Sequence, residues 1–237
     1  MSLLVPAASL GGVLLYSIAI LSLRPALRRG QTGAVPSNAV ESVARVGAIA
    51  WNAWLNFMIW THIAPAWGRL PGVIVATIGI LSAVRPVARC DAYQALLGWA
   101  SWLMPMSWPA TGLGLAAFAI SWISTLWGTR DVRVDRTSGV VEVAGLPVVA
   151  DFRGGFALGS FTFIVGVAPT PFSAVGISAH EAGHAMNVAA FGSAWHLLGN
   201  GIEQNVRPFA RGAHAYGELL AESRRPDQSQ PVLLQWS

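Results

Sequence analysis

The chain has 237 residues, of which 54% are hydrophobic, 11% are charged and eleven are tryptophan. Soluble globular domains contain about 25% charged residues, so this composition excludes an ordinary soluble domain and indicates a membrane protein. The formal net charge of +4 lies entirely in the first half, because residues 1–128 carry +5 and residues 129–237 carry −1. We interpret the arginines of the apolar half as topology signals, and no nucleic-acid partner is expected.

Residues 1–128 are expected to form a transmembrane helical domain, because crossing a bilayer core takes roughly 20 apolar residues of helix. One stretch is short and another is interrupted by Asn52, Asn56 and His62, but bilayers tolerate such spans by local thinning. The sequence therefore predicts a mainly α-helical, polytopic membrane protein with about five transmembrane helices. The expected spans are 3–23, 46–67, 70–84, 92–108 and 111–128.

The arginines favour one orientation. Nine of them follow the first, third and fifth stretches, and only Arg69 falls on the other side. Cytoplasmic loops are enriched in arginine, so the N-terminus is expected outside and residues 129–237 in the cytoplasm of a bacterial inner membrane. The N-terminus lacks a basic segment before its apolar run, so the first span is interpreted as a retained anchor in the lipid bilayer.

Residues 129–237 are expected to form a small α+β domain that lies in the cytoplasm or against the membrane. Residues 131–135 alternate polar and apolar side chains, 136–139 have turn chemistry and 140–143 resume an extended pattern, which predicts a β-hairpin. Residues 154–167 carry no charge and are rich in Phe, Val, Ile and Thr. They predict either a buried strand or half of a membrane hairpin.

A helix is predicted over residues 171–191. Thr170 is suited to an N-cap, Pro171 to the first helical position and Gly192 to the residue just past the end. This helix is either a core helix of the α+β domain, which we favour, or a span paired with residues 154–167. Substrates would then be cytoplasmic loops, tails or peptides at the bilayer surface in the first case, and membrane segments in the second.

The predicted helix contains the pattern His-Glu-x-x-His at residues 180–184. Residues four apart lie on one face of a helix, so His180 and His184 are positioned to bind one metal ion with Glu181 beside it. Catalytic zinc sites use three protein ligands and leave one position open, and a neighbouring Glu activates water as a general base. The single Cys90 excludes a cysteine zinc cluster.

The run His180-Glu181-Ala182-Gly183-His184, with Phe191-Gly192 following, resembles the signature helix of zincin-like zinc metalloproteases. It is similar in particular to the site-2 protease family of intramembrane enzymes. The resemblance implies one zinc ion, with His180 and His184 as ligands and Glu181 as the catalytic residue. In that family the third ligand is an Asp in a Leu-Asp-Gly motif, which this chain does not contain after His184.

The chain also resembles the gluzincins, whose third ligand is a Glu on a following helix. In the one-zinc aminopeptidases eighteen residues separate that Glu from the second histidine, and Glu203 stands at that separation from His184. The two resemblances cover about 25 residues of the chain. Glu203 is therefore the first candidate for the third ligand, and the alternatives are His196, His214 and Glu218.

Two functions remain open from the sequence. The first is a membrane-bound, zinc-dependent peptidase that hydrolyses protein or peptide substrates at or near the membrane surface. The alternative is a non-catalytic integral membrane subunit, in which the zincin-like helix serves metal binding or assembly with neighbouring membrane subunits.

Overall fold

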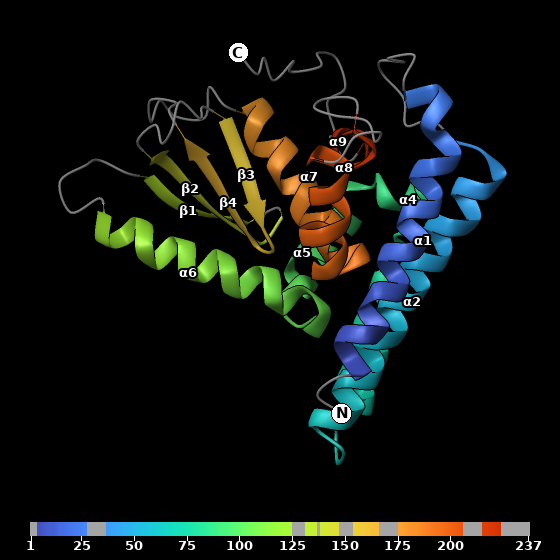
Figure 1. The fold of residues 1–237 in the computed structure, drawn as a ribbon. Helices are drawn as coiled ribbons and strands as arrows, with labels where there is room; N and C mark the ends of the chain where they lie inside the picture. The colour runs from blue at the N-terminus through green and yellow to red at the C-terminus, as the bar shows by residue number, and fades with distance from the viewer. Residues whose placement is uncertain are drawn as a thin grey trace.

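The computed structural model describes residues 4–27, 37–124, 131–136, 138–146, 154–165, 175–205 and 215–223. Within these ranges the chain is mostly helical, with one four-stranded sheet (Figure 1). The helices are α1 (Leu4–Leu27), α2 (Ala39–Ile63), α3 (Arg69–Leu81), α4 (Arg85–Ala88), α5 (Asp91–Ser101), the 3-10 turn η1 (Pro105–Ser107), α6 (Trp108–Ser124), α7 (Val175–Phe191), the π-helical turn η2 (Trp195–Asn200), α8 (Gly201–Asn205) and α9 (Tyr216–Glu222).

The two long helices α1 and α2 lie side by side at one edge of the molecule (Figure 1). Their shared core contains Tyr16 and Ile20 of α1 and Ile49 of α2, and it continues into Trp195 and Tyr216 from the C-terminal part of the chain. Residues that are far apart in the sequence therefore bury their apolar surface in one cluster, which fixes the C-terminal helices against the N-terminal pair.

The sheet has the strand order β1-β2-β4-β3. The hairpin prediction is confirmed, because β1 (Asp131–Asp135) pairs antiparallel with β2 (Val140–Leu146), and Gly139 takes a positive φ of 68° in the turn. The stretch 154–167 forms two strands rather than one. These are β3 (Gly154–Leu158) and β4 (Phe161–Val165), which pair antiparallel, while β4 also pairs parallel with β2.

Helices cover both faces of the sheet (Figure 1). Alternate strand residues point to opposite faces. Phe161 and Phe163 pack towards α6 in a cluster with Phe118, whereas Gly155 of β3 lies against Glu181 of α7. The central strand β4 is consequently buried along its whole length.

The prediction of about five transmembrane helices is wrong. Within the described ranges no single helix is both long and apolar enough to cross a membrane, and only one pair bent by 77°, Asp91–Ser101 with Pro105–Trp122, meets those criteria jointly. One reason is that the apolar stretches 70–84, 92–108 and 111–128 give helices of only 13, 11 and 17 residues. The stretch 70–84 gives a helix of 13 residues, which is about 20 Å long against a bilayer core of about 30 Å.

Polar side chains inside α2 further lower its apolar character, and the structure explains why they are there. Asn52 donates hydrogen bonds from Nδ2 to the carbonyl oxygens of Ala189 and Ala190, at 3.2 and 3.0 Å. Asn56 accepts one from the backbone N–H of Met106 at 2.9 Å. Both asparagines are buried, so they satisfy backbone groups of neighbouring segments that have lost contact with water.

The predicted helix over 171–191 is confirmed as α7 over Val175–Phe191, and the N-cap expected at Thr170 lies outside the described residues. The helix ends at Phe191, and Gly192 follows it directly, as predicted. The φ of Gly192 is 87°, a conformation that only glycine adopts without cost. A methyl group there would also lie 2.6 Å from Oδ1 of Asn52, so α2 packs directly against this helix end.

Candidate metal centre

The α7 helix holds both histidines of the His-Glu-x-x-His pattern in a buried position on one of its faces. His180 and His184 are four residues apart, and their rings meet edge to face with centroids 4.7 Å apart. Each side chain is almost inaccessible to solvent. Two imidazoles buried this deeply need polar partners, because an unpaired buried polar group is costly.

The partner is Glu218 on α9. Its Oε2 atom lies 2.9 Å from Nε2 of His180 and 3.2 Å from Nε2 of His184, and the two Nε2 atoms are 3.1 Å apart. Ligands held about 2.0–2.1 Å from a tetrahedral zinc ion are separated from one another by about 3.3–3.4 Å. The three atoms therefore form a triangle of nearly the size that one tetrahedral ion requires.

The donor set also fits zinc chemically. Two imidazole nitrogens and one carboxylate oxygen form a common three-ligand set of catalytic zinc sites. Among the described residues, this is the group of three ligand-type side chains whose donor atoms converge within 4.8 Å. The cluster is not sealed, because the side chain of Glu218 is 14% exposed.

A glycine inside the pattern allows α9 to reach the histidines. A methyl group at Gly183 would lie 2.5 Å from the carbonyl oxygen of Ala221, a backbone atom of α9. Only glycine permits this close approach of the two helices. Since Glu218 lies one turn before Ala221 on α9, the approach at Gly183 also places the Glu218 carboxylate beside the histidines.

The electrostatics of the cluster favour an ionised carboxylate. Burial raises the pKa of Glu218, but the neighbouring His184 and His180 outweigh it and hold that pKa well below the usual range. An ionised carboxylate is the form in which Glu218 can bind a divalent cation.

Glu181 follows His180 directly on α7, and its side chain lies between this helix and the sheet. It is only 2% exposed, and a methyl group at Gly155 of β3 would lie 2.5 Å from its Oε1 atom. The absence of a side chain at Gly155 therefore leaves the space that the Glu181 carboxylate occupies. The edge strand β3 and the α7 helix hold this carboxylate in place one residue from the first histidine.

Glu203, the first sequence candidate for the third ligand, does not lie in the cluster. Its carboxylate accepts hydrogen bonds from the hydroxyl of Tyr16 at 2.8 Å, from the backbone N–H of Gly217 at 3.1 Å and from the backbone N–H of Tyr216. The last two are the first N–H groups of α9, so Glu203 caps that helix. Burial raises the pKa of Glu203 to about 7.

His196 and His214 are the other two candidates for the third ligand. His196, on the π-helical turn, donates from Nε2 to the carbonyl oxygen of Ala157 at 2.7 Å, with its ring centroid 6.3 Å from that of His184. Burial and the neighbouring His184 lower the pKa of His196 to about 4, so it is a neutral donor that fixes β3. His214 lies outside the described residues.

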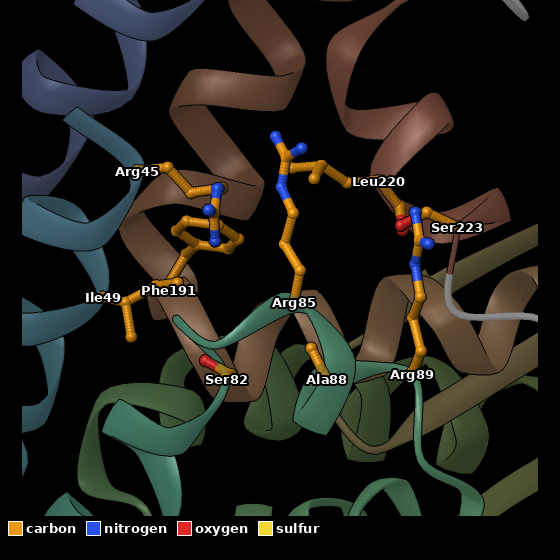
Figure 2. A pocket seen from close by; sticks show the side chains of 9 residues that line it. All are labelled: Arg45, Ile49, Ser82, Arg85, Ala88, Arg89, Phe191, Leu220 and Ser223. Carbon is orange, nitrogen blue, oxygen red and sulfur yellow. The ribbon is translucent and has the colours of Figure 1, made fainter. Parts of the chain in front are cut away.

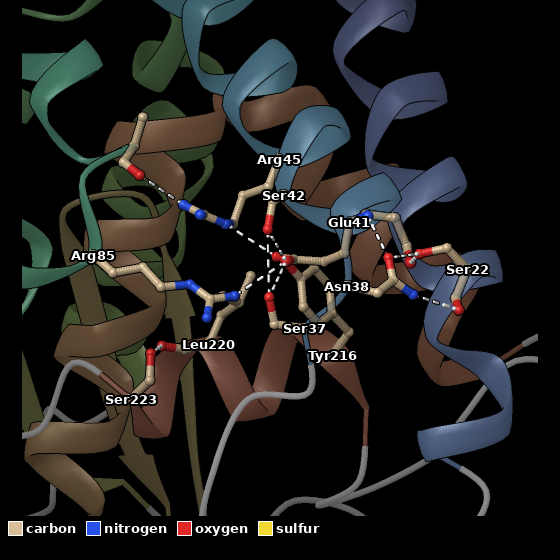
Figure 3. Close-up of polar contacts among 12 residues, drawn as sticks. Ser22, Ser37, Asn38, Glu41, Ser42, Arg45, Arg85, Tyr216, Leu220 and Ser223 are labelled. Carbon is tan, nitrogen blue, oxygen red and sulfur yellow. Dashed lines mark hydrogen bonds and ion pairs between the residues drawn. The ribbon is translucent and has the colours of Figure 1, made fainter.

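A second buried carboxylate, Glu41 of α2, holds α9 from the other side (Figure 3). The hydroxyl of Tyr216 donates to Glu41 Oε1 at 2.5 Å, and Arg45 and Arg85 form ion pairs with the same carboxylate at 3.0 and 3.1 Å. The helix that carries Glu218 is thus anchored at its first residue to α2 and α4.

Sequence reasoning missed this anchor, although one signal for it exists. Glu41 and Arg45 are an i,i+4 pair of opposite charge on a helix whose surroundings are apolar. A charged pair in such a setting indicates a buried ionic contact, but nothing local indicates that Tyr216 is its third member, because the two residues are 175 positions apart.

No protein-family model matches the chain, and neither the curated proteins nor the solved structures contain a significant match to it.

Proposed function

We propose that the protein is a zinc-dependent peptidase that acts at the surface of a lipid bilayer. The observation that carries the proposal is the convergence of His180, His184 and Glu218 from two helices, with Glu181 on the same helix as the histidines. Each group has a defined task in hydrolysis. His180, His184 and Glu218 are the residues that would hold the ion.

The bound ion would supply Lewis acidity, which polarises a carbonyl and makes water easier to deprotonate. Glu181 accepts a proton from the attacking water molecule while the oxygen atom of that water forms a bond to the peptide carbonyl carbon. Glu181 then donates that proton to the amide nitrogen as the carbon–nitrogen bond breaks, so the products are a carboxylic acid and an amine. The space left by Gly155 accommodates the Glu181 carboxylate beside the sheet.

The outward faces of several helices support contact with lipid. Many large apolar side chains there are strongly exposed, and an accumulation of such side chains on helix surfaces favours contact with a membrane or a partner. On α1, α2, α3, α5 and α6 these side chains include Leu10, Leu14, Leu21, Val43, Trp54, Leu70, Val73, Trp99, Leu113, Leu115, Ile120 and Trp122. A protein or peptide substrate would then be met at the bilayer surface, which agrees with the expected location in a bacterial inner membrane.

The test combines a metal assay with a cleavage assay on the full chain, purified in detergent without chelators. We expect about one zinc ion per chain by mass spectrometry, as a three-ligand site binds a single ion. This zinc should be lost in His180→Ala and in Glu218→Ala. Glu181→Gln should keep its zinc and yet cleave a pool of internally quenched peptides at least 100-fold more slowly.

Asp91→Asn is the matched control, because Asp91 is an exposed carboxylate at the start of α5 and should affect neither zinc nor cleavage. Protein that contains no zinc after this purification would contradict the metal site. Cleavage that survives in Glu181→Gln would contradict the assigned general base.

One observation favours a second candidate, a non-catalytic subunit that uses the metal to fix α9 on α7. The three donor side chains have little exposure, with 14% for Glu218 and 6% for each histidine. Stoichiometric zinc together with no cleavage of any peptide, in the presence or absence of vesicles, would favour this candidate. Neighbouring membrane subunits would then cover the apolar helix faces.

A further inference from the structure

A pocket lined by arginines lies between α4 and α9 (Figure 2). Its cationic wall consists of Arg45 of α2 with Arg85 and Arg89 at the two ends of α4, and Leu220 and Ser223 of the α9 segment close the opposite side. Successive residues of a helix are rotated by about 100°. Leu220 and Ser223 therefore point to the side of α9 opposite Glu218, and the pocket is separate from the metal centre.

The pocket has an excess of positive charge. Glu41 is the acidic group that pairs with two of the arginines, at 3.0 Å from Arg45 and 3.1 Å from Arg85. This carboxylate is completely buried and is also bound by the hydroxyl groups of Tyr216, Ser37 and Ser42. One acid against three arginines leaves a net charge of +2 on these side chains.

Two of the three arginines are held in place by hydrogen bonds, and all three retain free N–H donors. Arg45 is buried and donates from Nε to Glu41 and from Nη1 to the carbonyl oxygen of Ala83. Arg85 uses Nη2 for Glu41, and its side chain is still 39% exposed. Arg89 is exposed and has no hydrogen bond or ion pair with any residue that the structure describes. In Figure 2, Arg85 lies between the other two.

We infer that this pocket binds a phosphate group, either of a soluble phosphate ester or of a lipid headgroup. A guanidinium group presents its N–H donors in a planar fork that matches the oxygens of phosphate, and the attraction is strong where the cations are partly shielded from water. The pocket is open on one side, and its cavity volume is about 40 Å³. Apolar walls from Ile49, Phe191 and Leu220 accommodate the organic part of such a ligand.

The test measures binding of sodium phosphate and glycerol 3-phosphate to the full-length protein by calorimetry, in a buffer without other oxyanions. A second arm compares flotation with vesicles of phosphatidylcholine alone and vesicles that also contain phosphatidylglycerol. Arg89→Gln removes a cation that has no structural partner in the described chain. Arg69→Gln is the matched control, because Arg69 is also exposed but lies on α3, outside the pocket.

We expect saturable binding that weakens about tenfold or more in Arg89→Gln and is unchanged in Arg69→Gln, the size of effect that follows from losing one charge-assisted contact. If Arg89→Gln weakens only the binding of the soluble phosphates, the pocket binds a free phosphate ester. If Arg89→Gln weakens only the preference for vesicles that contain phosphatidylglycerol, the pocket binds a lipid headgroup. No binding in either arm, or equal loss in both variants, would overturn the inference.

Discussion

At the scale of single residues, the two buried carboxylates Glu203 and Glu41 have a structural task that their spacing did not predict. Glu203 accepts hydrogen bonds from the first backbone N–H groups of α9, and Glu41 accepts one from the hydroxyl of Tyr216. The residue before the helix, Ala215, has no side chain that could cap it. Both carboxylates therefore position Glu218, which lies two residues after Tyr216 on the same helix.

The raised pKa of Glu203 makes the stability of the protein depend on pH. The ordinary value is 4.5 and burial raises it to about 7, so folding favours the protonated form. The stabilisation is complete below about pH 4.5 and is lost as the pH rises through about 7. Glu203→Gln cannot ionise, so its stability lacks this pH-dependent contribution. We expect the free energy of unfolding of the native protein, minus that of the variant, to fall by roughly 3 kcal/mol between pH 4.5 and about pH 8.

Denaturant titrations followed by tryptophan fluorescence would measure this difference. The hydrogen bond from Tyr16 lowers the pKa of Glu203, so Tyr16→Phe should shift the pH-dependent step to higher pH. A difference between native protein and Glu203→Gln that stays constant with pH would show that Glu203 is not the group responsible.

At the scale of secondary-structure elements, the crossing of α7 and α9 assembles the candidate metal centre. The crossing depends on Gly183, where the α9 backbone passes too close for any side chain. The end of α7 depends equally on its neighbours, because Asn52 of α2 binds its last carbonyl groups. The position of the histidines is thus set by helices on both sides of α7.

Gly183→Ala should separate α9 from α7. The added methyl group would meet the carbonyl oxygen of Ala221 at 2.5 Å, a backbone atom that cannot rotate away. We expect Glu218 to withdraw from the histidines and the zinc affinity to fall about 10- to 100-fold, as for other residues that position ligands. Competition with a chromophoric zinc chelator measures this change.

Gly112→Ala on α6 is the matched control. A methyl group there has no neighbour within 4 Å, so the substitution should leave zinc affinity unchanged and stabilise the helix by up to about 1 kcal/mol. Equal zinc affinities for Gly183→Ala and the native protein would show that the close approach does not position Glu218.

At the scale of the whole molecule, the helices bury one set of faces and expose another. The inner faces form clusters that join α1 and α2 to α7, η2 and α9, and that join α3 and α5 to α7. The outer faces carry large apolar side chains such as Leu14, Leu70 and Ile120, which are 63%, 69% and 67% exposed. The composition that indicated a membrane protein therefore resides on the surface as well as in the core.

The triple variant Leu14→Gln, Leu70→Gln, Ile120→Gln should bind phosphatidylcholine vesicles much more weakly than the native protein. Burying one such side chain is worth about 1.5 kcal/mol or more, which is about tenfold in affinity for each residue that contacts lipid. Vesicle flotation measures the loss. Val134→Gln replaces an exposed apolar residue of β1 and should have no effect. A native protein that stays with the aqueous phase would contradict lipid contact.

The sequence by itself determined the features that depend on neighbouring residues. Alternation and turn chemistry predicted the hairpin of β1 and β2, and the glycine after Phe191 marked the end of α7. The spacing of His180 and His184 placed both on one helical face. These predictions succeeded because hydrogen bonding in turns and helices acts over at most a few residues.

Only the tertiary structure decided which carboxylate joins the histidines and how the apolar stretches divide into helices. Glu218 is 38 positions from His180, and Tyr216 is 175 from Glu41, so neither contact leaves a periodic trace in the sequence. Glu203 matched a spacing but caps α9 instead. Apolar composition likewise cannot reveal where a helix breaks, because hydrophobic burial depends on area and has no direction, whereas helix ends depend on specific partners such as Asn52.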